Sequence, residues 1–231
     1  MRICGFNKTT LLDYPGKVAS TIFLGGCNFR CPFCQNSVLV LEPTEQPDYR
    51  QEDILAFLKK RKGILDGVCI SGGEPTLADD LEGFLGKIKE LEYAIKLDTN
   101  GTHPEVVKNL AKKGLIDKVA MDIKACPSNY PMLAGISQPD MNRIQETVEF
   151  LMGGQLDYEF RTTVVRELHT EKDFREIGQW LKGARAYYLQ AYKDSEGVLK
   201  PGFGSYSREE LEGFCHILRQ TIQLVDVRGV D

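Results

Sequence analysis

The chain has 231 residues, a formal net charge of −4 and a hydrophobic fraction of 42%. A chain of this length can bury a large core without disulfide or metal staples, and the lack of a dense basic run argues against a nucleic-acid partner. No apolar stretch is long enough to span a bilayer, and the N-terminus lacks the apolar segment of a signal peptide. The seven cysteines, an odd number, fit a reducing compartment better than a disulfide framework. These features predict a cytoplasmic protein with no membrane partner.

Short apolar strands alternate with amphipathic helices along the chain. Strands are predicted over residues 18–24, 67–71, 94–99, 118–123, 158–165, 186–190 and 224–227. Helices are predicted between them, over 51–61, 81–91, 104–114, 144–151 and 170–182, and from a capping box at 207–210. Six or seven βα units in series predict a parallel sheet with right-handed crossovers, either doubly wound or curled into a barrel.

The unusual polar groups all follow the carboxyl ends of predicted strands. Barrel active sites are built at that face from several strands, whereas a doubly wound sheet concentrates its site at one switch point. The sequence therefore predicts an α/β fold with an incomplete barrel of about six units, and no composition break suggests a second domain within residues 1–231. Two long stretches at the same face, 125–140 and 191–205, are expected to be irregular loops where a macromolecular substrate could dock.

Three thiols, Cys27, Cys31 and Cys34, lie within eight residues directly after the first predicted strand. A cubane iron–sulfur cluster can take three thiolates and leave one iron open for a small molecule. A closed zinc site needs four ligands, so zinc would require a distant residue. Cys31 and Cys34 alone would fit a thioredoxin-like dithiol, but that chemistry has no use for Cys27. The spacing favours the cluster.

The segment Gly72-Gly73-Glu74-Pro75 follows the second predicted strand. Two glycines let the backbone approach a ligand closely, and Glu74 could accept an ammonium group. The alternative is an ordinary turn between a strand and a helix.

Four further groups are candidate ligand contacts. Residues 98–101, which include Asn100, either contact a ligand or form an Asx turn before the next helix. Asp122 and Lys124 share one face of a strand and either pair with each other or meet a ligand. Arg161 is expected to make a ligand contact or a salt bridge.

The isolated cysteines and histidines carry no clear chemistry. Cys69 and Cys215 are expected in the core, and Cys4 and Cys126 have no assigned place. The three histidines, at positions 103, 169 and 216, are expected at the surface or at helix caps.

The cysteine turn together with the Gly-Gly-Glu-Pro turn resembles the radical S-adenosylmethionine (SAM) superfamily. Residues 5–36 are similar to the compact activating proteins of anaerobic ribonucleoside-triphosphate reductase, relatives of pyruvate formate-lyase activating enzyme. One position departs from that pattern, because Gln35 stands where these activating enzymes usually carry His. The order of the strand-end motifs extends the resemblance over nearly the whole chain, as one radical SAM domain with a partial (β/α)6 TIM-like barrel.

The resemblance implies a [4Fe-4S] cluster held by Cys27, Cys31 and Cys34, with SAM bound at the open iron and cleaved reductively. The resulting 5′-deoxyadenosyl radical would remove a hydrogen from a backbone glycine of a partner enzyme, with a flavodoxin- or ferredoxin-like electron donor. Asp13 matches a residue near the reacting centre. Positions implied to contact SAM or a monovalent cation are Phe33, Gly72, Gly73, Glu74, Asp98, Thr99, Asp122 and Lys124.

Four other functions remain open on the sequence alone. Two are radical SAM functions: an enzyme acting on a small molecule, as 7-carboxy-7-deazaguanine synthase does, and an activator of a pyruvate formate-lyase-like enzyme. The other two are a non-catalytic electron carrier or zinc module and a dithiol oxidoreductase.

Overall fold

The computed structural model describes residues 1–230, and the chain divides into two compact units. The first unit comprises Met1–Asn28, Val38–Thr99 and His103–Ala120. The second comprises Phe29–Ser37, Asn100–Thr102 and the chain from Met121 onward.

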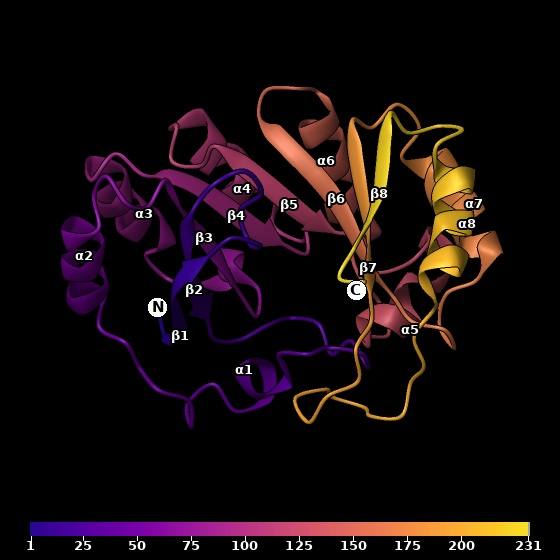
Figure 1. The fold of residues 1–231 in the computed structure, drawn as a ribbon, viewed down its shortest axis with the longest axis horizontal. Coiled ribbons are helices and arrows are strands. Elements are labelled where there is room, and N and C mark those ends of the chain that lie inside the picture. Colours follow the sequence, from indigo (N-terminus) through magenta and orange to yellow (C-terminus); the bar gives the residue numbers. More distant parts are fainter. Residues whose placement is uncertain (231) are drawn as a thin grey trace. The chain divides into compact units, whose positions relative to one another are not determined.

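The first unit contains strands β1 to β4, which are neighbours in the sheet in the order of the chain (Figure 1). Strand β1 (Ile3–Thr10) is antiparallel to β2 (Ala19–Leu24), which is parallel to β3 (Gly67–Gly72). Strand β4 (Ala94–Thr99) is parallel to β3. Parallel strands in register bring the carboxyl ends of β2 and β3 side by side, with Leu24 opposite Gly72.

Helices of the first unit bury one apolar face each. They are α1 (Ser37–Leu41, whose first residue belongs to the second unit), α2 (Gln51–Lys60), the 3-10 helix η1 (Pro75–Leu77), α3 (Leu81–Glu90) and α4 (Pro104–Lys112). On α3 the buried face is Leu81, Phe84, Leu85 and Ile88, the stripe at helical spacing that the sequence predicts. Pro104 opens α4, where its missing N–H costs nothing, and Gly114 at φ +65° follows the helix end.

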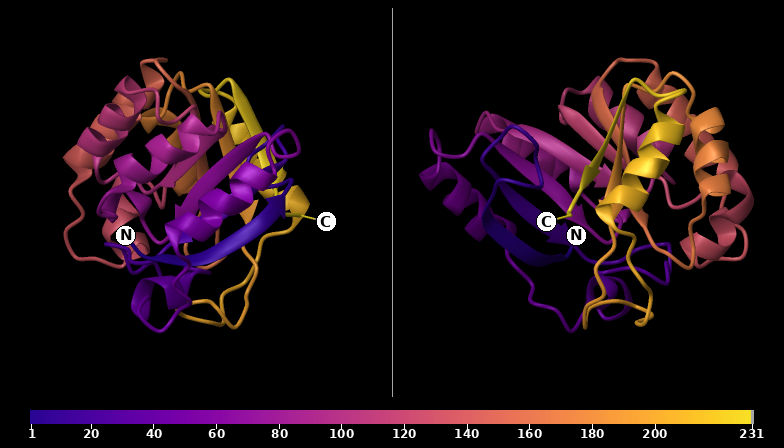
Figure 2. Two further views of the ribbon diagram at one scale, coloured as in Figure 1. Left: turned by 90° about the vertical axis from the view of Figure 1, so that its left-hand side faces the viewer. Right: turned by 45° about the vertical axis from the view of Figure 1, so that its right-hand side comes forward.

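The second unit contains the parallel strands β6 (Asp157–Val164), β7 (Ala186–Ala191) and β8 (Leu224–Arg228). The residues of strand β5 (Lys118–Asp122) are divided, with those up to Ala120 in the first unit and those from Met121 in the second. The helical elements of this unit are η2 (Pro127–Asn129), α5 (Tyr130–Ala134), α6 (Met141–Met152), α7 (Glu171–Trp180) and α8 (Arg208–Leu218). Helices α7 and α8 lie side by side, as Figures 1 and 2 show. The stacked rings of Phe174 and Phe214 join them. Both begin with a capping box, at Thr170 and at Ser207.

The predicted strands and helices are confirmed to within a few residues at their ends. The predictions omitted β1, α1 and η1 and were incomplete for residues 125–140. Strand β1 was not predicted, because its exposed Asn7, Lys8 and Thr9 interrupt the apolar pattern at the edge of the sheet. Residues 125–140 are not simply irregular, because η2 and α5 lie within them.

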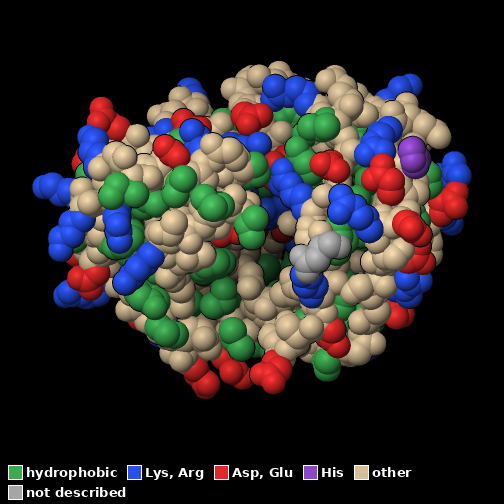
Figure 3. Space-filling view, in the orientation of Figure 1, with side chains coloured by type: hydrophobic (Ala, Val, Ile, Leu, Met, Phe, Trp, Pro, Cys, Tyr) green, Lys and Arg blue, Asp and Glu red, His purple; other side chains and the backbone are tan. Residues whose placement is uncertain are grey.

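Acidic and basic side chains are interspersed over the face drawn in Figure 3, in keeping with the small net charge. Within residues 1–230, no helix combines the length and the apolar character needed to cross a membrane.

Candidate functional site

The Gly-Gly turn after β3 packs backbone to backbone against the turn after β2. The amide of Gly73 donates to the carbonyl of Leu24, and that of Glu74 to the carbonyl of Gly26, both at 2.8 Å. A Cβ atom at Gly73 would lie 1.9 Å from the Gly26 oxygen, so no larger residue fits there. The glycine pair is therefore required to hold the turn that leads into Cys27.

The Glu74 carboxylate is buried and organises its surroundings. Its Oε1 accepts hydrogen bonds from Thr76 N (3.1 Å), Thr76 Oγ1 (2.5 Å) and Thr99 Oγ1 (2.8 Å). The carboxylate thus caps η1 and fixes the last residue of β4.

A buried ion pair lies on β4. The Nζ of Lys96, a side chain only 1% exposed, is 2.5 Å from Asp98 Oδ1, and Ser71 Oγ donates to Asp98 Oδ2 at 3.0 Å. The two residues share a face because they are two apart on a strand. Lys96 was missed in the sequence, although a single charge inside an apolar strand, two residues from a carboxylate, is the signal for such a pair.

Asp13 lies in the loop between β1 and β2. Its Oδ2 accepts a 2.5 Å hydrogen bond from Thr21 Oγ1, and its amide donates to Thr10 Oγ1. Thr21 is near the amino end of β2, whereas Cys27 follows the other end. The structure therefore places Asp13 apart from Glu74 and the other strand-end residues of its unit, and its role near a reacting centre stays a prediction.

In the second unit, Cys31 and Cys34 form a turn in which the Cys34 amide donates to the Cys31 carbonyl at 3.0 Å. The long loop after β7 is bonded to this turn, since Leu199 N donates to Cys34 O (3.0 Å) and Lys200 N to Pro32 O (2.8 Å). The turn is therefore held in place by a segment far along the chain.

Asp122, Lys124 and Arg161 form a charged cluster. Asp122 accepts from Arg161 Nε at 2.8 Å and from Lys124 Nζ at 3.0 Å. Burial alone would raise the pKa of Asp122, but the two cations outweigh it and hold that pKa well below its usual range. Burial would likewise lower the pKa of Lys124, but Asp122 and the nearby Cys31 raise it overall. All three groups are charged at neutral pH, and Arg161 makes the salt bridge that was one of its two expected contacts.

His169 is completely buried, so its prediction as a surface or capping residue was wrong. Its Nδ1 accepts from the Val165 amide at 3.1 Å and its Nε2 donates to the Lys124 carbonyl at 3.0 Å. The ring packs edge-on against Phe33 and stacks on Phe174. Burial lowers the pKa of His169, which is therefore a neutral residue that joins the cysteine turn to the end of β5.

Asn100 forms the Asx turn that was its structural alternative. Its Oδ1 accepts from Thr102 N at 3.0 Å and from Thr102 Oγ1 at 2.7 Å. Helix α6 holds this turn, since Arg143 Nε donates to the Thr102 carbonyl and Thr147 Oγ1 to the Gly101 carbonyl, both at 2.7 Å.

The isolated cysteines are part of the packing. Cys69 and Cys215 are fully buried, as predicted. Cys4 lies beneath Gly25, where an added Cβ would meet its sulfur at 2.6 Å. Burial raises the pKa of Cys126 to about 11, and its thiol lies 3.0 Å from Asp173 Oδ1.

Cys27 belongs to the first unit, and Cys31 and Cys34 belong to the second. None of the three forms a disulfide. Among residues 1–230, no three His, Cys, Asp or Glu side chains form a group that could hold a metal ion. The assignment of these cysteines as cluster ligands stays a prediction. Thiolate donors suit iron, and Lys124 is near enough to Cys31 for the cysteine to contribute to the raised pKa of the lysine.

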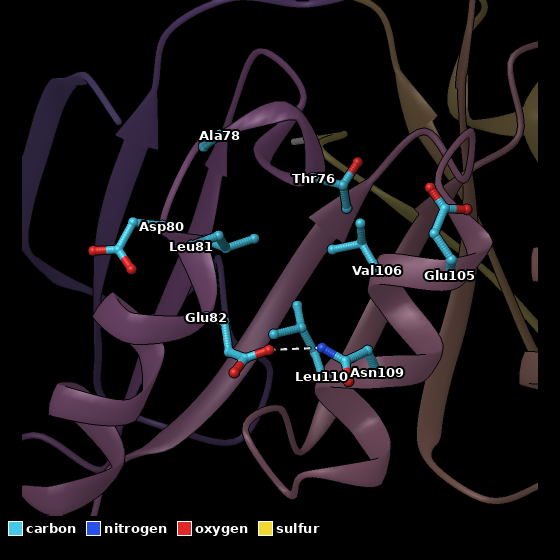
Figure 4. Close-up of a pocket in the computed structure, with 9 residues that line it drawn as sticks. All are labelled: Thr76, Ala78, Asp80, Leu81, Glu82, Glu105, Val106, Asn109 and Leu110. Carbon is cyan, nitrogen blue, oxygen red and sulfur yellow. Dashed lines mark hydrogen bonds between the residues drawn. The ribbon is translucent and has the colours of Figure 1, made fainter.

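One cavity, of about 420 Å³, lies on the helical side of the first unit, between η1, α3 and α4 (Figure 4). Its floor is apolar, and Glu82 at its edge is bonded to Asn109 at 2.7 Å and paired with Lys113 at 2.6 Å. None of the candidate site residues predicted from the sequence lines this cavity.

Comparison with known proteins identifies the family. Residues 21–181 match the family model described as the Radical SAM superfamily. The chain is 32% identical over 202 residues to the "Putative glycyl-radical enzyme activating enzyme MJ1227" of Methanocaldococcus jannaschii, and the match covers 84% of this chain and 81% of that protein.

Two solved structures show the fold. Streptococcus suis SuiB has a TM-score of 0.70 at 18% identity over 90% of this chain, which spans about half (48%) of SuiB. A domain of pyruvate-formate lyase-activating enzyme from Bacteroides vulgatus has a TM-score of 0.57 at 16% identity, covering 71% of this chain and 99% of that domain. The predicted fold class, an α/β partial barrel, is confirmed.

Proposed function

Because the chain belongs to the radical SAM superfamily, we propose that it is an activating enzyme that forms a glycyl radical on a partner enzyme, namely anaerobic ribonucleoside-triphosphate reductase. The observation that carries this proposal is the match of 84% of the chain to a relative named for glycyl-radical enzyme activation. The similarity of residues 5–36 to activators of the reductase supports the choice of partner.

Membership of the superfamily implies a [4Fe-4S] cluster and SAM as cofactors. In this proposal Cys27, Cys31 and Cys34 hold the cluster. When bound, the two cofactors supply the electron transfer and the 5′-deoxyadenosyl group that removes hydrogen from glycine. A flavodoxin- or ferredoxin-like protein is proposed as the electron donor, with a monovalent cation near the SAM carboxylate. The need to protect such a cluster from oxidation supports a cytoplasmic location.

Residues of the second unit would set the charge and the rigidity of the site. Lys124 offsets the negative charge of the neighbouring Cys31 thiolate, while Asp122 and Arg161 hold the lysine in place. Phe33 is buried against His169 and would present a fixed aromatic edge to the adenine.

Residues of the first unit would orient the methionine end of SAM. The Gly72–Gly73 backbone is fixed by its contacts with the preceding turn, and Glu74 is fixed by Thr76 and Thr99. Lys96 and Ser71 hold Asp98 in one orientation. Acceptors that are already held in place need little reorganisation when the cationic end of a ligand binds to them.

The test is anaerobic reconstitution with iron and sulfide, followed by reduction in the presence of SAM and a candidate partner. We expect release of methionine and 5′-deoxyadenosine, and a glycyl radical signal by electron paramagnetic resonance when anaerobic ribonucleotide reductase is added. Cys27→Ala should abolish both, although a dithiol oxidoreductase would tolerate that change.

The other outcomes distinguish the remaining functions. A radical signal on a pyruvate formate-lyase-like enzyme, but not on the reductase, would show that the reductase is the wrong partner. SAM cleavage coupled only to a small molecule would overturn the activating function. No SAM cleavage at all would favour an electron carrier or a zinc module.

A further inference from the structure

A polar pocket of about 270 Å³ lies at the carboxyl ends of the strands of the second unit. No role proposed above involves it. Its lining residues come from β6, β7, the end of β8, the loop after β7 and the residue after Cys34: Gln35, Thr163, Gln190, Ala191, Lys193, Arg228 and Gly229.

The strand register sets three polar side chains in a row. Thr163 on β6 lies opposite Gln190 on β7, and Gln190 lies opposite Arg228 on β8. Neighbouring residues of parallel strands project from the same face of the sheet. A hydroxyl, an amide and a guanidinium therefore stand side by side in the pocket.

The walls of the pocket are fixed before any ligand arrives. Arg228 makes a two-pronged ion pair with Glu159 (2.7 and 3.1 Å), whose side chain is 1% exposed, and it lies over the ring of Tyr188. Gln35 Nε2 donates to the Lys193 carbonyl at 2.8 Å, which ties the loop after β7 to the cysteine turn. The position that departs from the activator pattern is thus a wall of this pocket, one residue from Cys34.

The chemistry of the lining suits a peptide main chain. A glutamine amide offers one acceptor and two donors, which match the N–H and C=O of a peptide unit. Two cations, Arg228 and Lys193, and no carboxylate are among the lining residues, and Glu159 balances the charge of Arg228. The volume of about 270 Å³ is below the roughly 300–1,000 Å³ of typical small-molecule sites. A short stretch of backbone with small side chains fits it better than a free nucleotide.

A peptide could also bind by pairing with strand β8, but the backbone groups in the middle of β8 are already occupied. The Leu224 amide bonds toward β7, so Val225 and Val227 present their backbone groups on the other edge. Arg219 donates to the Val225 carbonyl at 3.1 and 2.8 Å, and Asp226 Oδ1 accepts from the Val227 amide at 2.8 Å. These side chains occupy the groups that a paired strand would need.

We propose that this pocket binds the main chain of the partner's glycine-bearing segment, with Gln190 and Gln35 pairing with the peptide groups that flank the glycine. The inference deepens the proposed function, since it rests on the substrate being a protein.

The test measures binding of a capped peptide, acetyl-Ser-Ala-Ser-Gly-Ser-Ala-Ser-amide, to the reconstituted protein with SAM, by anaerobic calorimetry. We expect Gln190→Leu and Thr163→Val to weaken binding about tenfold and severalfold respectively, because each removes a hydrogen bond to a desolvated peptide group. Methylation of the peptide nitrogens at and after the glycine should weaken binding about as much as Gln190→Leu. Gln223→Leu, at an exposed site outside the pocket, is the matched control and should bind as the wild type does. Thermal unfolding of each variant checks the fold.

Equal affinity in Gln190→Leu and the wild type would overturn the proposal, as would a wild type that does not bind the peptide at millimolar concentration. Gln190→Asn, which keeps the amide, separates loss of the hydrogen bond from loss of volume. Peptide binding does not require reduction of the protein, so it is measured independently of SAM cleavage. A protein that cleaves SAM but does not bind the peptide would overturn only the proposal for this pocket. A protein that binds the peptide without cleaving SAM overturns only the proposed function.

Discussion

The Nε2 atom of His169 donates to the carbonyl oxygen of Lys124 at 3.0 Å, while the Nδ1 atom of the same ring accepts from a backbone amide. The bond to Nδ1 requires the neutral ring, because a protonated ring has no acceptor. The buried histidine therefore makes the stability of this region dependent on pH.

The stability of the protein should fall as the pH falls below about 6.5, the pKa of an unfolded histidine. Burial lowers the pKa of His169 in the folded state, so the unfolded chain binds the proton first and acidification favours unfolding. The stability that neutral His169 contributes is complete above about pH 6.5. It is lost as the pH falls from there toward the pKa of His169 in the folded protein. Urea unfolding followed by the fluorescence of Trp180, the single tryptophan, measures this between about pH 7 and 5.

His169→Phe supplies the comparison. It keeps the aromatic volume and should cost about 1–3 kcal/mol at neutral pH through the lost hydrogen bonds, but its stability should vary less over the same pH range. An unchanged pH dependence in His169→Phe would show that other groups cause the effect.

Lys96→Met should destabilise the protein by about 3 kcal/mol or more, because it leaves the buried Asp98 carboxylate without its cation. Urea unfolding gives the value. Lys62→Met, which removes the exposed partner of Glu92, is the matched control and should change the free energy of unfolding far less. The double variant Lys96→Met with Asp98→Asn should recover part of the loss. If Lys96→Met lowers the free energy of unfolding no more than Lys62→Met does, the pair of Lys96 and Asp98 contributes little to stability.

Gly73→Ala should lower the iron content of the reconstituted protein. The added Cβ would collide with the Gly26 carbonyl and displace the turn that leads into Cys27. Gly86→Ala on α3 is the control, since nothing lies within 4 Å of the added atom and alanine favours a helix. Iron analysis per polypeptide should separate the two variants, and full iron loading in Gly73→Ala would contradict the argument.

Lys124→Met should weaken SAM binding about tenfold or more, because it removes the cation between Asp122 and the Cys31 thiolate. Equilibrium binding of SAM to the unreduced protein measures this without any turnover. Lys172→Met, at a side chain that is 85% exposed, should leave the affinity unchanged. Equal affinities in the two variants would remove Lys124 from the binding site.

The sequence predicted the parts of the fold that depend on local pattern. The strand over 94–99, the apolar stripe of α3 and the capping box at Ser207 are encoded in periodicity and in cap residues, and the structure has them. Strand β1 was missed because an edge strand with exposed polar residues lacks a period.

The missed side chains depend on tertiary context. His169 is buried because Phe33 and Phe174, far apart in sequence, meet around it. Lys96 is stable only because Asp98 and its surroundings compensate its burial. Among the predicted contacts, the pairing of Asp122 with Lys124 followed from the strand period, whereas their bond to Arg161 required the fold.

The bonds between the cysteine turn and the loop after β7 join segments that are made far apart in time. Ser37 reaches the Gly197 carbonyl across 160 residues of chain, and the Cys34 carbonyl is bonded to the same loop. During synthesis the thiols leave the ribosome long before the segment that fixes them. With the cluster held by these cysteines as proposed, we expect iron delivery to await an almost complete polypeptide, and truncation after α7 should yield a protein whose iron content stays near zero after reconstitution.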